Sequence, residues 1–402
     1  MTKLANLFLV LVILAGGCTP NHSRFQPSGR NTTFQFHVSF QDYIEESEKI
    51  IAQGRFDLND DNRDKIIAAN SPFELLPDEQ LFPRREDGRF EKGVLLIHGL
   101  ADSPYVMRPL ARHLQSRGFM VRAILLPGHG TCPGDLTEID YSEWLKAAEY
   151  SVKTLRKEVG RLYVGGYSVG AALSICLAQQ YPDIEGLFLL APALAIKTKL
   201  VHLTPYVKYL IDWLLIHDDA DYTRYESFSV NSVLQIYELT RRLDELTEKG
   251  LKLSMPVFAA VSTEDIVIDP LKFIDFFKNR VLSENSVLLV YSSSPDNFRK
   301  KDPRIVVRDS HLPAERIHDF SHLVLIMPPD DPHYGKNGDY QNCLHYRKNP
   351  TEEKICLEDD TVWQGEISRK NKKQGVMRRL SYHPRFQEMM NDLDLFLDGL
   401  RE

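Results

Sequence analysis

The chain has few cysteines and no long run of one charge. Five cysteines occur in 402 residues, and their spacing resembles no metal site. The formal net charge of −7 is spread along the chain, without an acidic tail or a basic stretch. Nucleic-acid-binding proteins usually concentrate lysine and arginine in one patch. We therefore expect no nucleic-acid partner.

The apolar run at the N-terminus, from Leu7 to Leu14, is too short to cross a bilayer as a helix. A lysine precedes it and small residues follow it, which is the pattern of a secretory signal. The sequence LAGGC that ends at Cys18 resembles a bacterial lipobox, whose cysteine is acylated after cleavage, although the usual leucine position holds Ala15. We predict that residues 1–17 are a signal peptide and that Cys18 carries a lipid anchor. The alternative is an ordinary cleaved signal with an unrelated cysteine.

Export would place the other cysteines in an oxidising compartment. Cys343 and Cys356 lie close together in a polar segment and are predicted to form a disulfide, whereas Cys176 is expected to be a buried apolar residue. Residues 18–35 are rich in Ser, Thr, Asn and Pro, which suits a polar tether between the anchor and a folded body. Thr19 stands where inner-membrane lipoproteins commonly have aspartate. We therefore expect the protein on the periplasmic face of the outer membrane.

Residues 36–402 are predicted to form one domain, because 43% hydrophobic residues suffice for one sizeable core. From residue 93 onward, continuous apolar runs alternate with amphipathic stretches, which is typical of a parallel sheet covered by helices on both faces. Strands are expected at 93–99, 120–127, 161–167, 186–193, 256–262 and 286–293, and helices at 104–117, 141–159, 169–181, 270–280 and 384–400.

Two insertions interrupt this alternation. Residues 195–250 carry aromatic and leucine clusters on predicted helices, between two strands, where a cap over an active site would be inserted. Residues 294–383 are expected to be irregular. The predicted architecture is thus a doubly wound, mostly parallel sheet with an inserted helical cap.

The strongest signal for chemistry is the sequence GYSVG at residues 166–170, between an apolar strand and a helix. Glycines there allow a sharp turn that holds a serine hydroxyl above the strand ends, so Ser168 is the predicted nucleophile. The first core strand ends at His98, beside this turn. The backbone N–H groups of Leu100 and Val169 are therefore the predicted oxyanion hole. His98 is expected to brace its loop and not to transfer protons.

The chain contains, in order, HGLADSP, LLPGHGTCPGDL, YSEWL and GYSVGA. In order and spacing these motifs resemble the α/β-hydrolase families that include monoacylglycerol lipases, lysophospholipases and small carboxylesterases. The resemblance covers about residues 90–195 well and 255–270 moderately. It implies an α/β-hydrolase fold and an acid after the strand that follows the cap. Asp265 stands in that place, with Glu264 and Asp269 as competitors.

The general base is harder to predict, because an insertion follows SVLLVYSS where these families have the histidine loop. His311, His322 and His333 compete. A serine before and an apolar residue after the histidine fit both His311 and His322. We choose His322 because the sequence after it, MPPDDPHYGKNGDY, is typical of a new surface excursion. The chain order Ser168, Asp265, His322 is the order that the fold uses.

These residues predict a serine hydrolase that cleaves acyl esters through an acyl-enzyme, without a metal or organic cofactor. An aromatic-rich cap and a membrane anchor suggest lipid-like or small ester substrates. A peptidase or amidase is the first rival, since Asp218, Asp219 and Asp221 form an acidic cluster that would hold a substrate amine. A non-catalytic envelope binding protein is the second, and the presence of Ser168 disfavours it. The sequence leaves the chain-length preference and the oligomeric state open.

Overall fold

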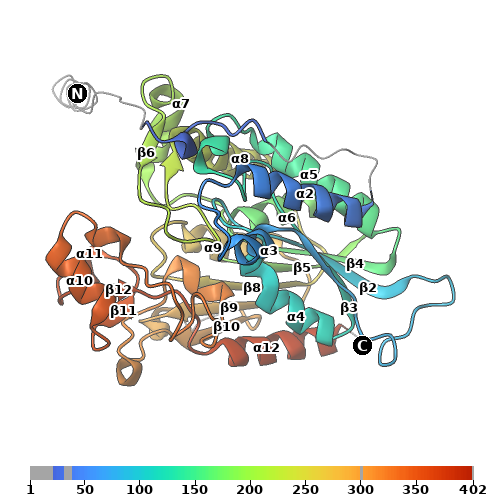
Figure 1. Ribbon diagram of the computed structural model, residues 1–402. Coiled ribbons are helices and arrows are strands. Elements are labelled where there is room, and N and C mark those ends of the chain that lie inside the picture. The colour runs from blue at the N-terminus through green and yellow to red at the C-terminus, as the bar shows by residue number, and fades with distance from the viewer. Residues whose placement is uncertain (1–20, 31–38, 299–301, 401–402) are drawn as a thin grey trace.

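The computed structural model describes residues 21–30, 39–298 and 302–400 (Figure 1). The predicted signal peptide and Cys18 lie outside these ranges. None of the helices found within them combines the length and the apolar character that a membrane span requires.

An eight-stranded sheet forms the centre of the domain. Its strand order is β1-β3-β2-β4-β5-β8-β9-β10, and every neighbouring pair is parallel except β1 and β3. The strands are β1 (Phe73–Leu75), β2 (Phe90–Ile97), β3 (Phe119–Ile124), β4 (Val159–Tyr167), β5 (Ile184–Leu190), β8 (Val257–Ser262), β9 (Val287–Ser292) and β10 (Ile305–Asp309). Strands such as β3 and β8 are buried along their whole length, which explains their continuous apolar runs. The predicted fold class is confirmed.

Helices cover both faces of the sheet (Figure 1). On one face lie α4 (Arg108–Ser116) and α12 (Phe386–Gly399), which are joined by an ion pair between Arg117 and Asp398. On the other lie α5 (Tyr141–Leu155) and α6 (Val169–Gln180). Almost every residue of α6 is buried because the helix runs directly behind the central strands. The remaining long helix of this part, α9 (Pro270–Arg280), connects β8 to β9.

The cap between β5 and β8 contains less helix than predicted. It consists of η4 (Lys199–Leu203), α7 (Thr204–Val207), the paired strands β6 (Trp213–Leu215) and β7 (Phe228–Ser229), and α8 (Val230–Glu248). Residues 216–227, here called the cap loop, join β6 to β7 and carry Tyr222 and Tyr225, which were expected on helices. Asp219 explains why these residues are not helical. Its carboxylate accepts hydrogen bonds from the backbone N–H groups of Glu226 and Ser227 and so competes with helix formation.

The sequence predicted that the C-terminal segment, residues 294–383, would be irregular. The structure instead shows strands and helices in it. It carries β10 at the edge of the sheet, a small pair of strands, β11 (Trp363–Gly365) and β12 (Met377–Arg379), and the helices α10 (Pro350–Glu358) and α11 (Arg369–Lys372). The prediction missed β10 because this edge strand is only partly buried and lacks a continuous apolar run. A disulfide joins Cys343 to Cys356, the pair that the sequence indicated.

The N-terminal part of the described chain packs against the domain. Two helices, α2 (Phe40–Gly54) and α3 (Arg63–Asn70), precede β1. Within the segment predicted to be a tether, residues 21–30 lie on the cap: Phe25 is buried, with its ring centroid 4.9 Å from that of Trp213, and Arg24 donates to the carbonyl oxygens of His217 and Asp218. The tether prediction was therefore wrong for these ten residues, because their few apolar and charged side chains find partners on the cap.

Candidate active site

Ser168 lies at a sharp turn between β4 and α6. Its backbone has φ 55° and ψ −113°, a combination that residues other than glycine rarely adopt. A Cβ atom on Gly166 would lie 2.4 Å from the carbonyl carbon of Gly170, and one on Gly170 would lie 2.0 Å from the carbonyl oxygen of Ile97. Only glycine fits at both positions. The turn thus has the close packing and the strained serine of a nucleophile elbow.

The structure brings the three predicted catalytic residues together. The Nε2 atom of His322 lies 3.1 Å from Ser168 Oγ, and its Nδ1 atom lies 2.5 Å from Asp265 Oδ2. Because the carboxylate accepts the Nδ1–H, Nε2 is left to accept a proton from the serine. Burial alone would raise the pKa of Asp265, but His322 and the backbone N–H groups of Ile268 and Val267 hold that pKa below 3.8. Asp265 therefore remains a carboxylate that orients the imidazole.

The ends of parallel strands explain two of these positions. Ser168 follows β4 and Asp265 follows β8, and both strands end at the same edge of the sheet. His322 starts a short 3-10 helix, η7 (His322–Ile326), in the C-terminal segment. The backbone of this segment is fixed beside the sheet by Ser262, whose hydroxyl donates to the carbonyl oxygen of Phe320 over 2.7 Å.

The competing acids have other partners. Glu264 Oε1 accepts hydrogen bonds from the backbone N–H and the hydroxyl of Ser293, at 2.9 and 2.8 Å. Asp269 caps α9 through the backbone N–H of Leu271, at 3.0 Å. Of the three carboxylates considered, only Asp265 reaches His322 in the part of the chain that the structure describes.

The competing histidines also lie elsewhere. The Nδ1–H of His311 donates to the carbonyl oxygen of His318 over 3.0 Å, and its ring stacks beside Trp363. His333 lies between Asp221 and Asp339. Neither ring has Ser168 among its partners in the described ranges, so the choice between the three histidines falls on His322.

His98 holds the loop after β2, as the sequence indicated. Its Nδ1–H donates to the carbonyl oxygen of Gly99 over 2.7 Å, and its Nε2 accepts the backbone N–H of Leu126 over 3.0 Å. Burial lowers the pKa of His98 well below 6.5, so the ring stays neutral and keeps one donor and one acceptor. The loop that it braces carries Leu100.

The backbone N–H groups of Leu100 and Val169 are available for an oxyanion. Within the described residues, neither group donates a hydrogen bond to another group of the protein. Leu100 and Ser168 line the same cavity, and Val169 is the first residue of α6 directly after the nucleophile. This arrangement suits two donors that bind a developing negative charge beside Ser168.

Sequence reasoning missed two residues that hold His322. The fully buried carboxylate of Glu366 accepts the backbone N–H of His322 over 3.2 Å and forms an ion pair with Arg379 at 3.1 Å. Tyr167 donates its hydroxyl to the carbonyl oxygen of His322 over 3.2 Å. Tyr167 belongs to the elbow motif itself, but Glu366 lies 44 residues after His322 and no local pattern marks it.

A cavity of about 990 Å³ opens onto Ser168 and His322. Much of its lining is apolar and comes from the cap and from the loop that carries Asp265. These apolar side chains include Leu214, Leu215, Ile216, Phe228, Ile236 and Ile268. The size and the lining are those of a site for a molecule with a substantial apolar part. Nowhere in the described ranges do three or more His, Cys, Asp or Glu side chains gather as they would around a metal ion.

The acidic cluster of the cap loop is occupied by internal contacts. Asp218 pairs with Arg347 at 3.4 Å, and Asp219 accepts two backbone N–H groups and pairs with Arg24. Asp221 accepts hydrogen bonds from His333 and Tyr334. None of the three carboxylates lines the cavity in the described part of the chain. The cluster therefore does not provide the amine site that an aminopeptidase would need.

Comparison with known proteins agrees with this geometry. Residues 88–217 match the family described as serine aminopeptidase, S33. The chain is 31% identical over 183 residues to the thermostable monoacylglycerol lipase of Bacillus sp. (strain H-257), over 44% of this chain and 72% of that protein. It is 24% identical over 204 residues to a carboxylesterase of Bacillus subtilis (strain 168), over 50% of this chain and 78% of that protein.

Among solved structures, a monoacylglycerol lipase from Paleococcus ferrophilus aligns with a TM-score of 0.44 at 20% identity, over 55% of this chain and 88% of that chain. The sequence similarity to the Bacillus lipase defines the class: the chain belongs to the α/β-hydrolase family of serine hydrolases. Within that family it is a relative of monoacylglycerol lipases and carboxylesterases.

Proposed function

We propose that this protein hydrolyses carboxylic acyl esters through an acyl-enzyme formed on Ser168. The observation that carries the proposal is the hydrogen-bonded series of Ser168, His322 and Asp265 on the wall of the large cavity. The similarity to a monoacylglycerol lipase and a carboxylesterase supports an ester as the scissile bond.

The reaction follows from the positions of these groups. Ser168 Oγ attacks the ester carbonyl carbon while His322 Nε2 accepts the hydroxyl proton. The N–H groups of Leu100 and Val169 bind the oxyanion, and Asp265 stabilises the imidazolium that forms. His322 then returns the proton to the leaving alcohol. A water molecule, activated by the same imidazole, releases the carboxylic acid and restores the serine.

The cavity favours substrates with an apolar acyl group. Its apolar residues come mainly from the cap, as in a site that removes an acyl chain from water. We therefore expect activity to rise with acyl chain length until the cavity is filled.

The test uses p-nitrophenyl esters of graded chain length and a fluorophosphonate probe. Ser168→Ala should abolish covalent labelling and lower kcat/KM by several orders of magnitude, because no other group replaces the nucleophile. Ser174→Ala is the matched control, since this buried serine of α6 donates to the carbonyl oxygen of Gly170 and is not in the series. Normal labelling of the Ser168→Ala protein would contradict the proposal.

We also infer that Cys18 is acylated and holds the protein at the periplasmic face of the outer membrane. The lipobox-like sequence before Cys18 supports this inference. Cys18→Ser should move the protein from the detergent-extracted membrane fraction to the soluble or unprocessed fraction. Unchanged partitioning after correct cleavage would count against an anchor at this residue.

A further inference from the structure

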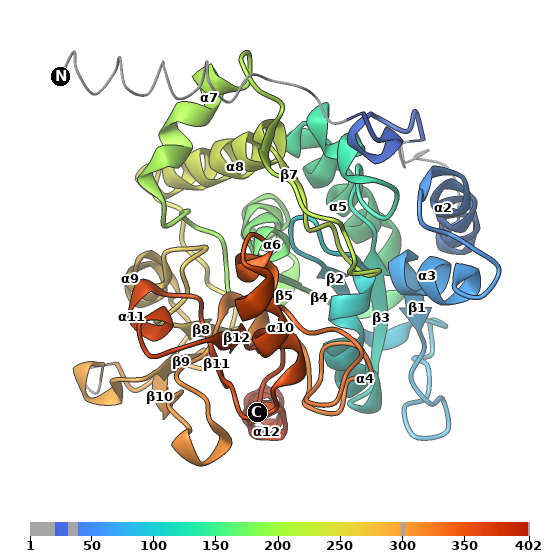
Figure 2. The same ribbon diagram turned by 60° about the vertical axis from the view of Figure 1, so that its left-hand side comes forward.

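The catalytic cavity has a second kind of lining besides the apolar one. Polar and charged side chains enter it from the cap loop and from the C-terminal segment, which lies below the cap in Figure 2. The cations are Arg224, Arg347, Lys348 and Arg379, and the carboxylates are Asp102 and Glu226. The substrate therefore meets a basic wall as well as an apolar one.

Arg224 is a buried cation of this wall whose N–H donors find no acceptor within the described residues. Its side chain is 14% exposed, and its nearest acid is Asp102, with 3.7 Å between Nε and Oδ1. This distance is too long for a hydrogen bond. Within the described residues the guanidinium has no hydrogen-bond acceptor, although it has five N–H donors. A buried guanidinium with free donors on the wall of a cavity suits an anionic oxygen of a ligand.

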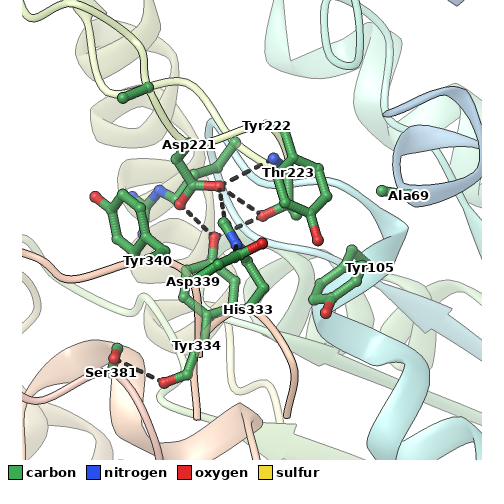
Figure 3. Close-up of polar contacts among 12 residues, drawn as sticks. Ala69, Tyr105, Asp221, Tyr222, Thr223, His333, Tyr334, Asp339, Tyr340 and Ser381 are labelled. Atoms are coloured by element: carbon green, nitrogen blue, oxygen red, sulfur yellow. Dashed lines mark hydrogen bonds and ion pairs between the residues drawn. The ribbon is translucent and has the colours of Figure 1, made fainter. Parts of the chain in front are cut away.

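Arg224 is also held in position. One and three residues before it, Thr223 and Asp221 bond to Tyr334 and His333 of the C-terminal segment (Figure 3). Two residues after it, Glu226 accepts the hydroxyl of Tyr340 over 2.5 Å. The cap loop is thus fixed on both sides of Arg224. A binding group fixed in this way loses little conformational freedom when the ligand arrives.

Lys348 supplies a second positive charge. It lies on the cavity wall two residues after η8 (Leu344–Tyr346), and it is exposed. No carboxylate within the described ranges forms an ion pair with it. Arg347 and Arg379, by contrast, are already paired, with Glu353 at 2.7 Å and Glu366 at 3.1 Å. Within the described ranges, the cations of the wall that form no hydrogen bond are therefore Arg224, which lies 3.7 Å from Asp102, and Lys348.

The two carboxylates of the cavity wall, Asp102 and Glu226, form no hydrogen bond with Arg224 in the described ranges. Glu226 is a hydrogen-bond acceptor for Tyr340 and for the backbone N–H of Ala220. Burial raises the pKa of Glu226 and that of Asp102, against the opposing effects of Tyr340 and Arg224. Glu226 therefore does not use the N–H donors of Arg224, and the Asp102 carboxylate lies beyond hydrogen-bond reach of them.

We propose that the substrate is an acyl ester whose alcohol part carries an anionic group, a phosphate or a carboxylate, which Arg224 and Lys348 bind while the acyl chain enters the apolar part of the cavity. This inference rests on the proposed esterase function and names its substrate class. The phosphate would form a bidentate pair with the Arg224 fork, whereas Lys348 contributes a single mobile charge.

The experiment measures kcat/KM of the mature protein for three lauroyl esters that share one acyl chain. They are monolauroylglycerol, which is neutral, monolauroylglycerol phosphate and lauroyl glycerate, which carries a carboxylate. We expect wild type to prefer at least one anionic ester over the neutral ester by roughly tenfold or more. The two anionic arms identify whether phosphate or carboxylate is the group that is bound.

Three variants test the residues, and the measured quantity is the ratio of kcat/KM for the preferred anionic ester to that for the neutral ester. Arg224→Gln and Lys348→Gln should each lower this ratio, by roughly tenfold and threefold. Arg241→Gln is the control, because Arg241 is 54% exposed on α8 and outside the cavity, and it should leave the ratio unchanged. Lys348 is exposed, so its variant keeps the test valid if Arg224→Gln does not fold.

The outcomes separate this inference from the function on which it rests. Turnover of the neutral ester that equals or exceeds turnover of both anionic esters would overturn the inference and leave the esterase function standing. An unchanged ratio in both Arg224→Gln and Lys348→Gln would also overturn it. Absence of Ser168-dependent turnover of any ester would instead overturn the esterase function.

Discussion

Replacing His333 with glutamine should weaken the attachment of the cap loop to the C-terminal segment. His333 is almost fully buried between Asp221, whose carboxylate is also buried, and Asp339, which is 55% exposed. Its Nε2–H donates to Asp221 over 2.9 Å (Figure 3). Glutamine keeps most of the side-chain volume but removes the positive charge.

The magnitude follows from the burial of Asp221. Removing one partner of a buried ion pair costs about 3–5 kcal/mol, because the other charge is left unpaired. Asp221 keeps the hydroxyl of Tyr334 at 2.6 Å and the backbone N–H of Thr223 at 2.9 Å. These donors reduce the loss, so we expect His333→Gln to lower the free energy of unfolding by about 2 kcal/mol. Asp339 adds little, because a pair with a half-exposed partner is screened by solvent.

The loss should depend on pH in a defined direction. Burial alone would lower the pKa of His333, but the hydrogen bonds and charges of Asp221 and Asp339 outweigh burial and raise this pKa above 6.5. The stabilisation is therefore complete below about pH 6.5 and is lost as pH rises through the folded-state pKa. The pKa values of Asp221 and Asp339 are lowered below 3.8, so their contribution is lost only as pH falls below that value.

The assay is urea unfolding followed by intrinsic fluorescence at about pH 6 and about pH 9. Wild type should lose more stability than His333→Gln between these two conditions. His202→Gln is the control, because His202 is an exposed histidine of the cap bonded to Tyr237, and its variant should lie within about 0.5 kcal/mol of wild type. Equal stability of His333→Gln and wild type at about pH 6 would refute the reasoning.

Three further changes test the site and its support. His322→Ala should reduce kcat/KM nearly as much as loss of Ser168, whereas His311→Ala should stay within roughly tenfold of wild type; the reverse pattern in steady-state kinetics would move the base to His311. Glu366→Gln should lower kcat by roughly tenfold with little change in KM, because the backbone N–H of His322 loses a charged acceptor. An effect confined to KM would assign Glu366 to substrate binding. Cys356→Ser should lower the free energy of unfolding by about 3 kcal/mol in urea titrations, as expected for opening a loop of this size, and equal stability with and without the disulfide would contradict this.

The fold and the nucleophile could be predicted because their signals are local. Buried parallel strands leave continuous apolar runs, and the elbow leaves glycines around Ser168. The position of Asp265 followed from the resemblance to the α/β-hydrolase families, in which the acid comes after the strand that follows the cap. The structure places both residues where the sequence predicts them.

The remaining features depend on contacts between distant parts of the chain. His311 and His322 have similar neighbours in sequence, so only the course of the C-terminal segment separates them. Glu366 reaches the backbone of His322, and Arg224 reaches the cavity, through contacts that no periodicity or motif records. The edge strand β10 was missed for a related reason, because its half-buried surface produces no distinctive pattern.

The disulfide between Cys343 and Cys356 encloses Arg347 and Lys348, two of the cations that line the catalytic cavity. The cross-link spans 13 positions and is buried at both ends. Oxidation of these two cysteines therefore fixes both ends of the segment that carries Lys348. Protein produced in a reducing cytosol would have the same sequence and the same catalytic centre, but a wall with greater freedom to rearrange. Preparations that differ only in their oxidation history would then rank the same esters differently.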